Sequence, residues 1–198
     1  MNPSRPLLVT IAGPNGAGKS TAAPALLRDT LEVTEFVNAD AIAGGLSAFR
    51  PESVAMAAGR IMLERMRSLA ESGESFAFET TLASRSFAPW IADLKGRGYH
   101  IHVMYLWLET AELALDRVEA RVRQGGHDVP ANVVRRRYER GLRNLFSLYL
   151  PLADSWQVFD NSQVGLPVPI ASGRGVRAEH VLNEQLWMHL EETYHERS

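Results

Sequence analysis

The 198-residue chain contains no cysteine. This absence excludes disulfide frameworks, zinc sites built from thiolates, and cysteine nucleophiles. The chain also lacks an apolar run long enough to span a bilayer, and its first six residues, MNPSRP, lack the pattern of a secretory signal. We therefore predict a cytoplasmic protein with no membrane partner.

The chain also lacks a large net charge of either sign. The 21 basic and 23 acidic residues give a formal net charge of −2, which gives no reason to expect general nucleic-acid binding. A hydrophobic content of 45% and a charged content of 22% are ordinary for a soluble globular protein. The length suits one domain with a sizeable core, and we predict a single domain over residues 1–198.

Lysine is scarce, and one of the two lysines lies in a motif. Lys19 belongs to the sequence GPNGAGKS at residues 13–20, a complete Walker A loop between the apolar run 7–12 and an alanine- and leucine-rich segment. Such a strand–loop–helix context lets backbone N–H groups and a helix N-terminus converge on phosphate. We predict that a nucleotide's phosphates bind Gly13, Pro14, Asn15, Gly16, Ala17, Gly18, Lys19, Ser20 and Thr21. The Ser20 hydroxyl is also expected to ligate magnesium.

Short apolar runs alternate with helical patterns, which favours a parallel sheet covered by helices. We expect an α/β fold of the P-loop NTPase or kinase type, with about five strands at 7–12, 36–38, 75–78, 101–108 and 157–159. Helices are expected after the phosphate loop, with a kink at Pro24, and over 51–73, 87–96, 110–125 and 130–150. An extension of about 165–198 should hold an edge strand at 168–171, a turn at 173–175 and a helix over 178–194.

Two carboxylates, Asp40 and Glu79, follow expected strands at the edge where parallel sheets bind ligands. Asp40 suits a general base that accepts a proton from an attacking hydroxyl. The alternatives are that it helps to hold magnesium through water or that it caps the next helix. Glu79 stands where a Walker B motif has aspartate, and we expect it to act on magnesium or on a substrate hydroxyl. Thr80 and Thr81 are further candidates for substrate binding, and capping of the following helix is again the alternative.

Arginine is concentrated in one segment. Residues 117–143 hold eight arginines and three acids, an excess of five positive charges in a chain of net charge −2. A glycine-rich loop at 124–130, which contains His127, divides them. Helices that close over a triphosphate need such cations, because the arginine guanidinium group can donate two parallel hydrogen bonds to phosphate oxygens. We predict a lid over about 111–150 in which Arg117, Arg121 and Arg136 act in catalysis. His127, at the tip of this lid, is a candidate for phosphate contact. For any single arginine, and for His127, a solvated surface position is the alternative.

Two more residues are candidates for ligand binding. Arg60 is preceded by small residues on the expected 51–73 helix, so the helix could approach the phosphate loop or a substrate closely; an exposed helical arginine is the alternative. Asn161 follows the last strand of the sheet, where P-loop kinases place the adenine-binding loop, and an ordinary turn is the alternative.

Taken together, these segments resemble the zeta toxin family of P-loop kinases. The resemblance lies in residues 13–21, 37–42, 57–60, 78–82, 125–130, 135–138 and 160–162. It implies an α/β P-loop fold, ATP and Mg²⁺ as cofactors, Lys19 and Ser20 as ligands of phosphate and magnesium, and Asp40 as the base. A Gly-Gly-His sequence stands at residue 127 where the family pattern leads one to expect a lid arginine.

The resemblance also implies a function. Zeta toxins phosphorylate a sugar hydroxyl of UDP-N-acetylglucosamine and are commonly restrained by a small antitoxin, so we expect a kinase acting on a nucleotide sugar and an antitoxin partner. Two alternatives stay open. The arginine-rich segment also suits a kinase of nucleic-acid ends, and glutamate in place of the Walker B aspartate also suits a nucleotide-dependent binding module.

Overall fold

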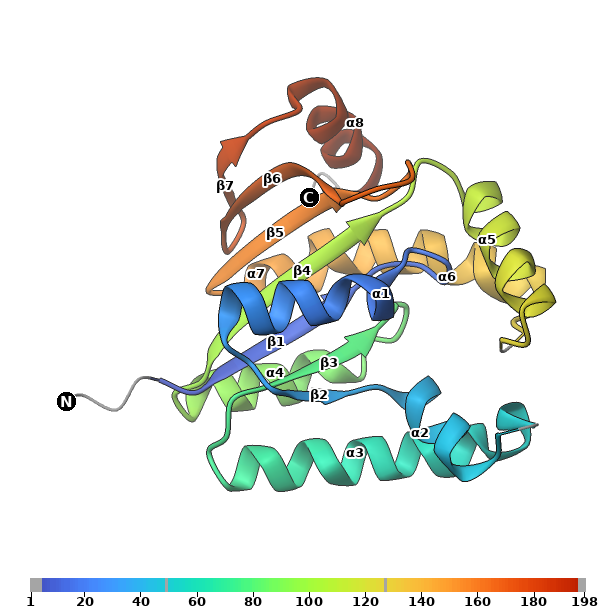
Figure 1. Ribbon diagram of the computed structural model, residues 1–198. Helices are drawn as coiled ribbons and strands as arrows, with labels where there is room; N and C mark the ends of the chain where they lie inside the picture. The colour runs from blue at the N-terminus through green and yellow to red at the C-terminus, as the bar shows by residue number, and fades with distance from the viewer. Residues whose placement is uncertain (1–4, 49, 127, 196–198) are drawn as a thin grey trace.

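A seven-stranded sheet forms the middle of the molecule in the computed structural model, which describes residues 5–48, 50–126 and 128–195 (Figure 1). The strand order is β2-β3-β1-β4-β5-β6-β7. The strands are β1 (Leu7–Ala12), β2 (Glu35–Val37), β3 (Phe76–Thr80), β4 (His100–Trp107), β5 (Ser155–Asp160), β6 (Val168–Arg174) and β7 (Arg177–Val181).

The predicted α/β fold class is confirmed. Strands β1 to β5 pair in parallel, and β6 and β7 add two antiparallel strands, so the sheet has seven strands where about five were expected. Strand β1 lies between β3 and β4 with all residues after Leu7 buried. Such burial on both faces explains why the central strands read as continuous apolar runs.

The prediction of a helix starting at residue 178 is wrong. Residues Arg177–Val181 form β7, and the helix starts at Glu184 after the cap residue Asn183, whose side chain accepts a hydrogen bond from the Leu186 N–H at 3.1 Å. The strand was hidden because its residues are polar and largely exposed. An edge strand with one solvated face gives no continuous apolar signal.

Helices cover both sides of the sheet (Figure 1). Helix α1 crosses in front of the strands, whereas α4, α6 and α7 lie behind them. The helices are α1 (Lys19–Pro24), α2 (Ala39–Leu46), α3 (Ala55–Glu71), α4 (Phe87–Gly96), α5 (Ala111–Arg123), α6 (Ala131–Asn144), α7 (Leu150–Leu152) and α8 (Glu184–Tyr194). None of the helices within the described ranges is both long and apolar enough to cross a membrane.

Proline changes the first helix as expected. Pro24 ends the α-helical part of α1, and Ala25–Thr30 continue as a π-helix. Proline has no N–H to donate to the carbonyl four residues earlier, so the regular hydrogen-bond ladder cannot continue through it. A second π-helical turn, Leu145–Tyr149, and a 3₁₀ turn, Pro51–Val54, complete the helical segments.

Helix α8 is held by aromatic packing. The indole of Trp187 stacks on that of Trp156 in β5, with ring centroids 5.2 Å apart and planes at 18°. Trp187 also lies 5.5 Å from the ring of Phe146. Both tryptophans are buried, so the C-terminal extension closes the core over β5.

Candidate functional site

The loop between β1 and α1 turns on three glycines in left-handed conformations. The φ angles are 144° at Gly13, 78° at Gly16 and 75° at Gly18. A Cβ atom at Gly13 would meet the Leu106 carbonyl of β4, and one at Gly16 would lie 2.7 Å from the Ala114 carbonyl of α5. Only glycine fits both the backbone angle and the space. The loop is therefore held tightly between β4 and α5.

Lys19 is buried within this loop, with 6% of its side chain exposed. Its Nζ donates to the Pro14 carbonyl at 2.9 Å and lies 3.5 Å from Glu79 Oε1. Burial lowers the pKa of Lys19, and the Glu79 carboxylate acts in the opposite direction. A desolvated cation with one carboxylate partner is poised to attract further negative charge, such as phosphate oxygens.

Three polar side chains from separate elements meet next to Lys19. Glu79 Oε2 accepts a hydrogen bond from the Ser20 hydroxyl at 2.7 Å and one from Asn38 Nδ2 at 2.6 Å. Asn38 Nδ2 also lies 3.2 Å from Ser20 Oγ. The tertiary structure thus joins the two residues predicted to hold magnesium, Ser20 and Glu79, at hydrogen-bond distance.

Asn38 is the residue of this cluster that the sequence reasoning missed. Its Oδ1 accepts hydrogen bonds from the Asp40 N–H at 2.8 Å and the Ala41 N–H at 3.1 Å. Asn38 therefore caps α2, which corrects the alternative that Asp40 is the cap. An asparagine between an apolar run and a helix is itself a cap signal, and it could have been found.

The donor chemistry of the cluster fits magnesium. Ser20 supplies a hydroxyl and Glu79 a carboxylate, both hard oxygen ligands of the kind that Mg²⁺ uses together with phosphate oxygens and water. Within the described residues, no group of three or more His, Cys, Asp or Glu side chains could enclose a metal ion. The protein's own ligands would thus fill only part of a magnesium coordination sphere.

Asp40 faces three cations. Its carboxylate lies 3.9 Å from an Arg121 guanidinium nitrogen, with 58% and 39% of the two side chains exposed. The charge of Asp40 also raises the pKa of Lys19 and of Arg137, although burial lowers the pKa of both groups more strongly. One half-exposed carboxylate therefore lies within electrostatic reach of cations from α1, α5 and α6.

Two neighbouring cavities meet at Asp40. One, of about 270 Å³, is lined by the phosphate loop together with Asp40, Glu79, Arg117 and Arg121. The other, of about 300 Å³, shares Ser20, Asp40 and Arg121 with it and extends along α2 to Ala55 and Gly125. A carboxylate between two cavities suits a reaction that joins two bound molecules.

Arg117 holds the loop that follows β5. Its two terminal nitrogens donate to the Asn161 and Ser162 carbonyls, each at 2.8 Å. Asn161 Nδ2 in turn donates to the Ala17 carbonyl of the phosphate loop at 2.8 Å. Both of these predicted residues thus lie at the phosphate loop, with Arg117 engaged in positioning its neighbours.

On α6, the arginine that contacts the phosphate loop is Arg137, which the sequence reasoning did not select. Its Nη1 donates to Asn15 Oδ1 at 3.3 Å. The selected Arg136 is exposed and, like Arg137, is not among the described residues that line the two cavities. The two arginines are adjacent in sequence, so only the orientation of α6 distinguishes them. His127 lies outside the described residues.

Most of α6 belongs to the core. The Tyr138 hydroxyl donates to the Leu108 carbonyl at 2.7 Å, and Asn144 Nδ2 donates to the Leu82 carbonyl at 2.7 Å. A Cβ atom on Gly141 would collide with the carbonyl of Thr81. From Tyr138 onward, the segment predicted as a lid is thus fastened against the loops after β3 and β4.

The loop after β3 has a constrained backbone. Leu82 is fully buried and has φ 55°, a left-handed conformation that costs a leucine about 1–2 kcal/mol. Thr80 and Thr81 use their hydroxyls to accept from the N–H groups two residues later, at 3.1 and 3.4 Å. Neither threonine caps α4, and Glu79 does not cap it either. Arg60 lies apart from the phosphate loop, on a separate groove between α3 and α4.

Comparison with known proteins supports a P-loop domain. The profile of a family described as AAA domain matches residues 8–147. A protein of Haemophilus influenzae described as uncharacterized is 29% identical over 126 residues, which cover 64% of this chain and 88% of that protein. The range matched by the family profile contains the phosphate loop, Asp40, Glu79 and all of α6.

Solved structures share the fold. A chain of the AvrRxo1-ORF1:AvrRxo1-ORF2 complex with sulphate ions aligns with a TM-score of 0.75 at 18% identity, covering all of this chain and 66%, just under two thirds, of that chain. The same complex with ATP gives 0.73 at 18% identity, with 100% and 66% coverage. A chain from the PezAT chromosomal toxin–antitoxin system of Streptococcus pneumoniae gives 0.64 at 15% identity, covering 100% and 82%. These likenesses agree with the predicted P-loop kinase fold.

Proposed function

The chain belongs to the AAA domain family, and we propose that it is an ATP- and magnesium-dependent phosphotransferase of the zeta toxin type that acts on a hydroxyl of a small molecule. The observation that carries this proposal is the convergence of Lys19, Ser20, Asp40, Glu79 and Arg121 around one cavity at the phosphate loop. A nucleotide-binding loop alone would need no carboxylate at the junction with a second cavity. A transferase needs a base there.

The residues divide into three roles in this reaction. Lys19 and the loop glycines hold the triphosphate, while Arg121 and Arg137 neutralise charge that develops on the transferred phosphoryl group. Asp40 accepts the proton of the acceptor hydroxyl while the hydroxyl oxygen attacks the γ-phosphorus and the bond from that phosphorus to the leaving ADP oxygen breaks. Ser20 and Glu79 would hold the magnesium ion, which supplies charge neutralisation at the phosphates when bound.

Asp40 is suited to its role by its surroundings. Three cations, Lys19, Arg121 and Arg137, lie within electrostatic reach of its carboxylate, and its exposed side chain is open to an acceptor hydroxyl. Asn38 fixes its backbone N–H, so the position of Asp40 does not depend on the side chain that reacts. Arg117 and Asn161 would support the nucleotide from the loop after β5.

The acceptor and the partner follow from resemblance. UDP-N-acetylglucosamine is the leading candidate acceptor, because zeta toxins phosphorylate it. A small antitoxin is the proposed partner, supported by a structural neighbour that belongs to a toxin–antitoxin system. Expression of the chain alone should then slow cell growth, and the Lys19→Ala variant should not.

The test of the proposed activity uses the two lysines of the chain. Purified protein is incubated with labelled ATP, magnesium and either nucleotide sugars or a small-molecule cell extract, and labelled products are separated. Wild type should form a phosphorylated acceptor, and Lys19→Ala should not. Lys95→Ala is the matched control, because Lys95 pairs with Asp154 at 3.1 Å on a separate part of the protein. Slow ATP hydrolysis without a labelled acceptor in any pool would contradict the proposal.

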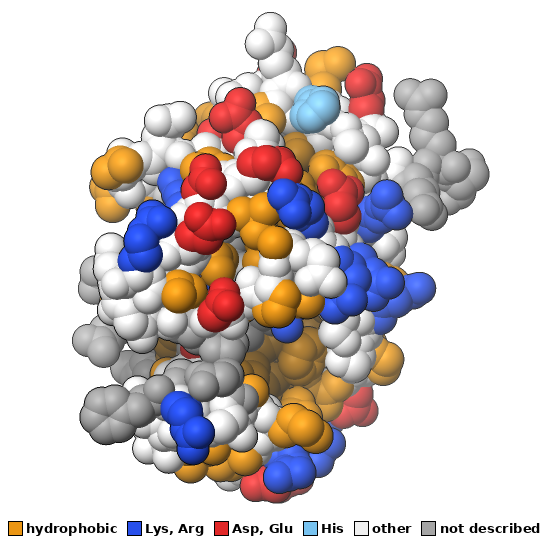
Figure 2. All heavy atoms as spheres, turned by 90° about the vertical axis from the view of Figure 1, so that its right-hand side faces the viewer, with side chains coloured by type: hydrophobic (Ala, Val, Ile, Leu, Met, Phe, Trp, Pro, Cys, Tyr) orange, Lys and Arg blue, Asp and Glu red, His pale blue; other side chains and the backbone are white. Residues whose placement is uncertain are grey.

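A kinase of nucleic-acid ends is the second candidate. One observation favours it: a group of Lys and Arg side chains gathers on the face that holds the carboxyl ends of the strands (Figure 2). Steep salt dependence and competition by oligonucleotides would support this candidate, and labelled transfer to an oligonucleotide end would establish it.

A further inference from the structure

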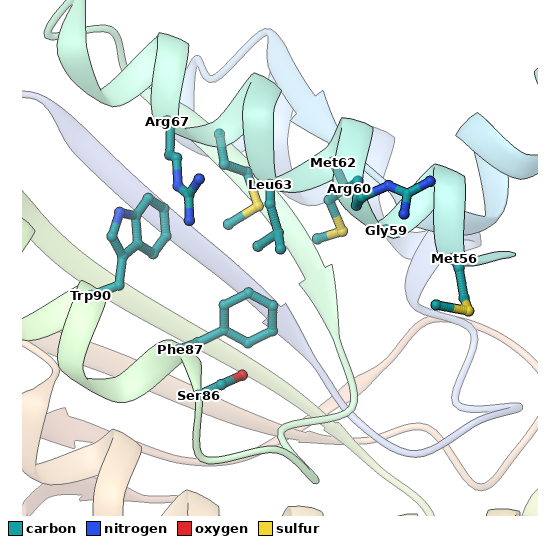
Figure 3. A pocket seen from close by; sticks show the side chains of 10 residues that line it. Met56, Gly59, Arg60, Met62, Leu63, Arg67, Ser86, Phe87 and Trp90 are labelled. Carbon is teal, nitrogen blue, oxygen red and sulfur yellow. The ribbon is translucent and has the colours of Figure 1, made fainter.

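A groove of about 580 Å³ lies between α3 and α4, outside the cavities at the phosphate loop. Its size is that of a small-molecule pocket. Figure 2 shows a hollow with hydrophobic side chains on the lower part of this face, and Figure 3 shows the groove from nearby. The groove plays no part in the mechanism described above.

The floor of the groove is apolar and preformed. Phe87 and Trp90 of α4 lie opposite Met62, Leu63 and Met56 of α3 (Figure 3). The Phe87 ring lies 5.1 Å from the ring of Phe78 in β3, and Trp90 lies 6.3 Å from the same ring at a T-shaped angle of 74°. These rings rest on the central sheet, so the floor offers a fixed surface for stacking.

The walls carry only positive charge. Arg60 and Arg67 line the groove, and no acidic residue is among its described lining residues. Figure 3 shows the Arg67 guanidinium reaching from α3 toward Trp90, whereas Arg60 extends along α3 toward Met56. Across the described part of the chain, neither arginine has an ion pair or a hydrogen bond from its side chain. Other exposed arginines of this protein, such as Arg65, do pair with carboxylates.

We propose that this groove binds the non-reacting part of the acceptor, and that this part is a planar ring carrying an anionic group. The ring would stack on Phe87 and Trp90, and the anion would pair with Arg67 or Arg60. A polyhydroxylated chain is disfavoured, because besides the two guanidiniums the described lining offers only the Ser86 hydroxyl and the Trp90 indole N–H as polar side-chain groups.

The groove and the cavity that contains Asp40 share none of their described lining residues, but consecutive residues at the start of α3 line the two. Ala55 lines the cavity that contains Asp40, and the next residue, Met56, lines the groove. Ser86, at the other wall, ends the loop that begins after Thr80. A molecule seated in the groove could therefore direct a hydroxyl toward Asp40. This last step depends on the proposed kinase activity, whereas the binding preference does not.

The binding preference is tested with three probes that differ in one property each. 4-(Hydroxymethyl)benzoate has a ring and a charge, its neutral amide has the ring alone, and gluconate has a charge and hydroxyls but no ring. Binding is measured by ligand-observed NMR and by intrinsic fluorescence. Trp107, Trp156 and Trp187 are buried, so a benzoate-induced fluorescence change should come from Trp90 and should be lost in Trp90→Phe.

Two variants of α3 should weaken benzoate binding by about tenfold or more, the scale of a lost charge-assisted contact. Arg67→Gln removes the cation, and Leu63→Glu places a negative charge at a side chain that is 41% exposed, where folding should tolerate it. Arg65→Gln is the matched control on the same helix, because Arg65 pairs with Glu35 at 2.8 Å and does not line the groove.

The outcomes separate this inference from the proposed function. Equal binding of benzoate and amide, tighter binding of gluconate, or an unaltered affinity in Arg67→Gln would overturn the groove assignment. Transfer to an acceptor without benzoate binding would leave the kinase proposal standing and remove this one. Specific benzoate binding without phosphoryl transfer to any acceptor would support the groove and count against the kinase.

Discussion

Replacing Asp40 by asparagine should abolish phosphoryl transfer and leave the fold intact. The substitution keeps the size of the side chain but removes the group that accepts the proton. Asn38 continues to bond the backbone N–H of residue 40 at 2.8 Å, so α2 keeps its cap. Lys19, Ser20 and Glu79 keep their mutual contacts, which do not involve Asp40.

The expected magnitudes differ widely between catalysis and stability. A general base contributes about 10²–10⁴-fold to a rate, so kcat should fall by that factor, which corresponds to about 3–5 kcal/mol of transition-state free energy. The ion pair with Arg121, at 3.9 Å between half-exposed side chains, is worth about 0–1 kcal/mol. The free energy of unfolding should therefore change by less than about 1 kcal/mol.

The assay compares wild type, Asp40→Asn and Asp93→Asn at saturating ATP. Asp93 is an exposed aspartate of α4 whose nearest cation, Arg97, lies 3.8 Å away on the same helix, so it serves as the control for an Asp→Asn change. Labelled product gives kcat, ATP titration gives nucleotide affinity, and urea unfolding gives stability. A kcat within threefold of wild type would show that Asp40 is not the base. A large loss of stability would show that the carboxylate is structural.

Three further predictions test other parts of the structure. Arg137→Gln should lower kcat by about 10-fold or more, since it removes a cation beside the phosphate loop. The adjacent Arg136→Gln should have little effect. A larger loss of kcat in Arg136→Gln than in Arg137→Gln would refute the role given to Arg137. Burial lowers the pKa of His102 from 6.5 to about 4. Between these pH values the unfolded chain binds more protons than the folded one, so the free energy of unfolding should fall by about 2 kcal/mol from pH 7 to pH 5. In urea unfolding, this fall should be flattened in His102→Gln and kept in the exposed control His180→Gln. Gly141→Ala should destabilise by about 1–3 kcal/mol, because its methyl group would meet a carbonyl of the loop after β3; thermal unfolding would disprove this if it showed the gain that alanine ordinarily gives in a helix.

The predictions that agree with the structure depended on residues close to one another in sequence. The phosphate loop is a continuous stretch whose glycine spacing and flanking apolar run reflect local backbone requirements, so its geometry could be expected from the chain alone. The central strands β1, β3 and β4 were also visible, because burial on both faces leaves a continuous apolar signal. Strand β7 was not visible, since its polar residues carry no such signal.

Contacts between distant segments were beyond the reach of the sequence. The contact between Glu79 and Ser20 spans 59 residues, and the one between Arg137 and Asn15 spans 122. Whether Arg136 or Arg137 points at the phosphate loop depends on a helical rotation of about 100° per residue, which is set by how α6 packs against the loops after β3 and β4.

The sequence by itself determined that this protein has a nucleotide-type phosphate loop at the head of a parallel sheet, because that loop's conformation depends on its own glycines. The tertiary structure alone decided which of the eight arginines in residues 117–143 share the space in front of it with Asp40 and Glu79. It also decided that Arg60 and Arg67, which have no ion pair within the described residues, border an apolar groove, because both arrangements arise from packing between elements that the chain order does not specify.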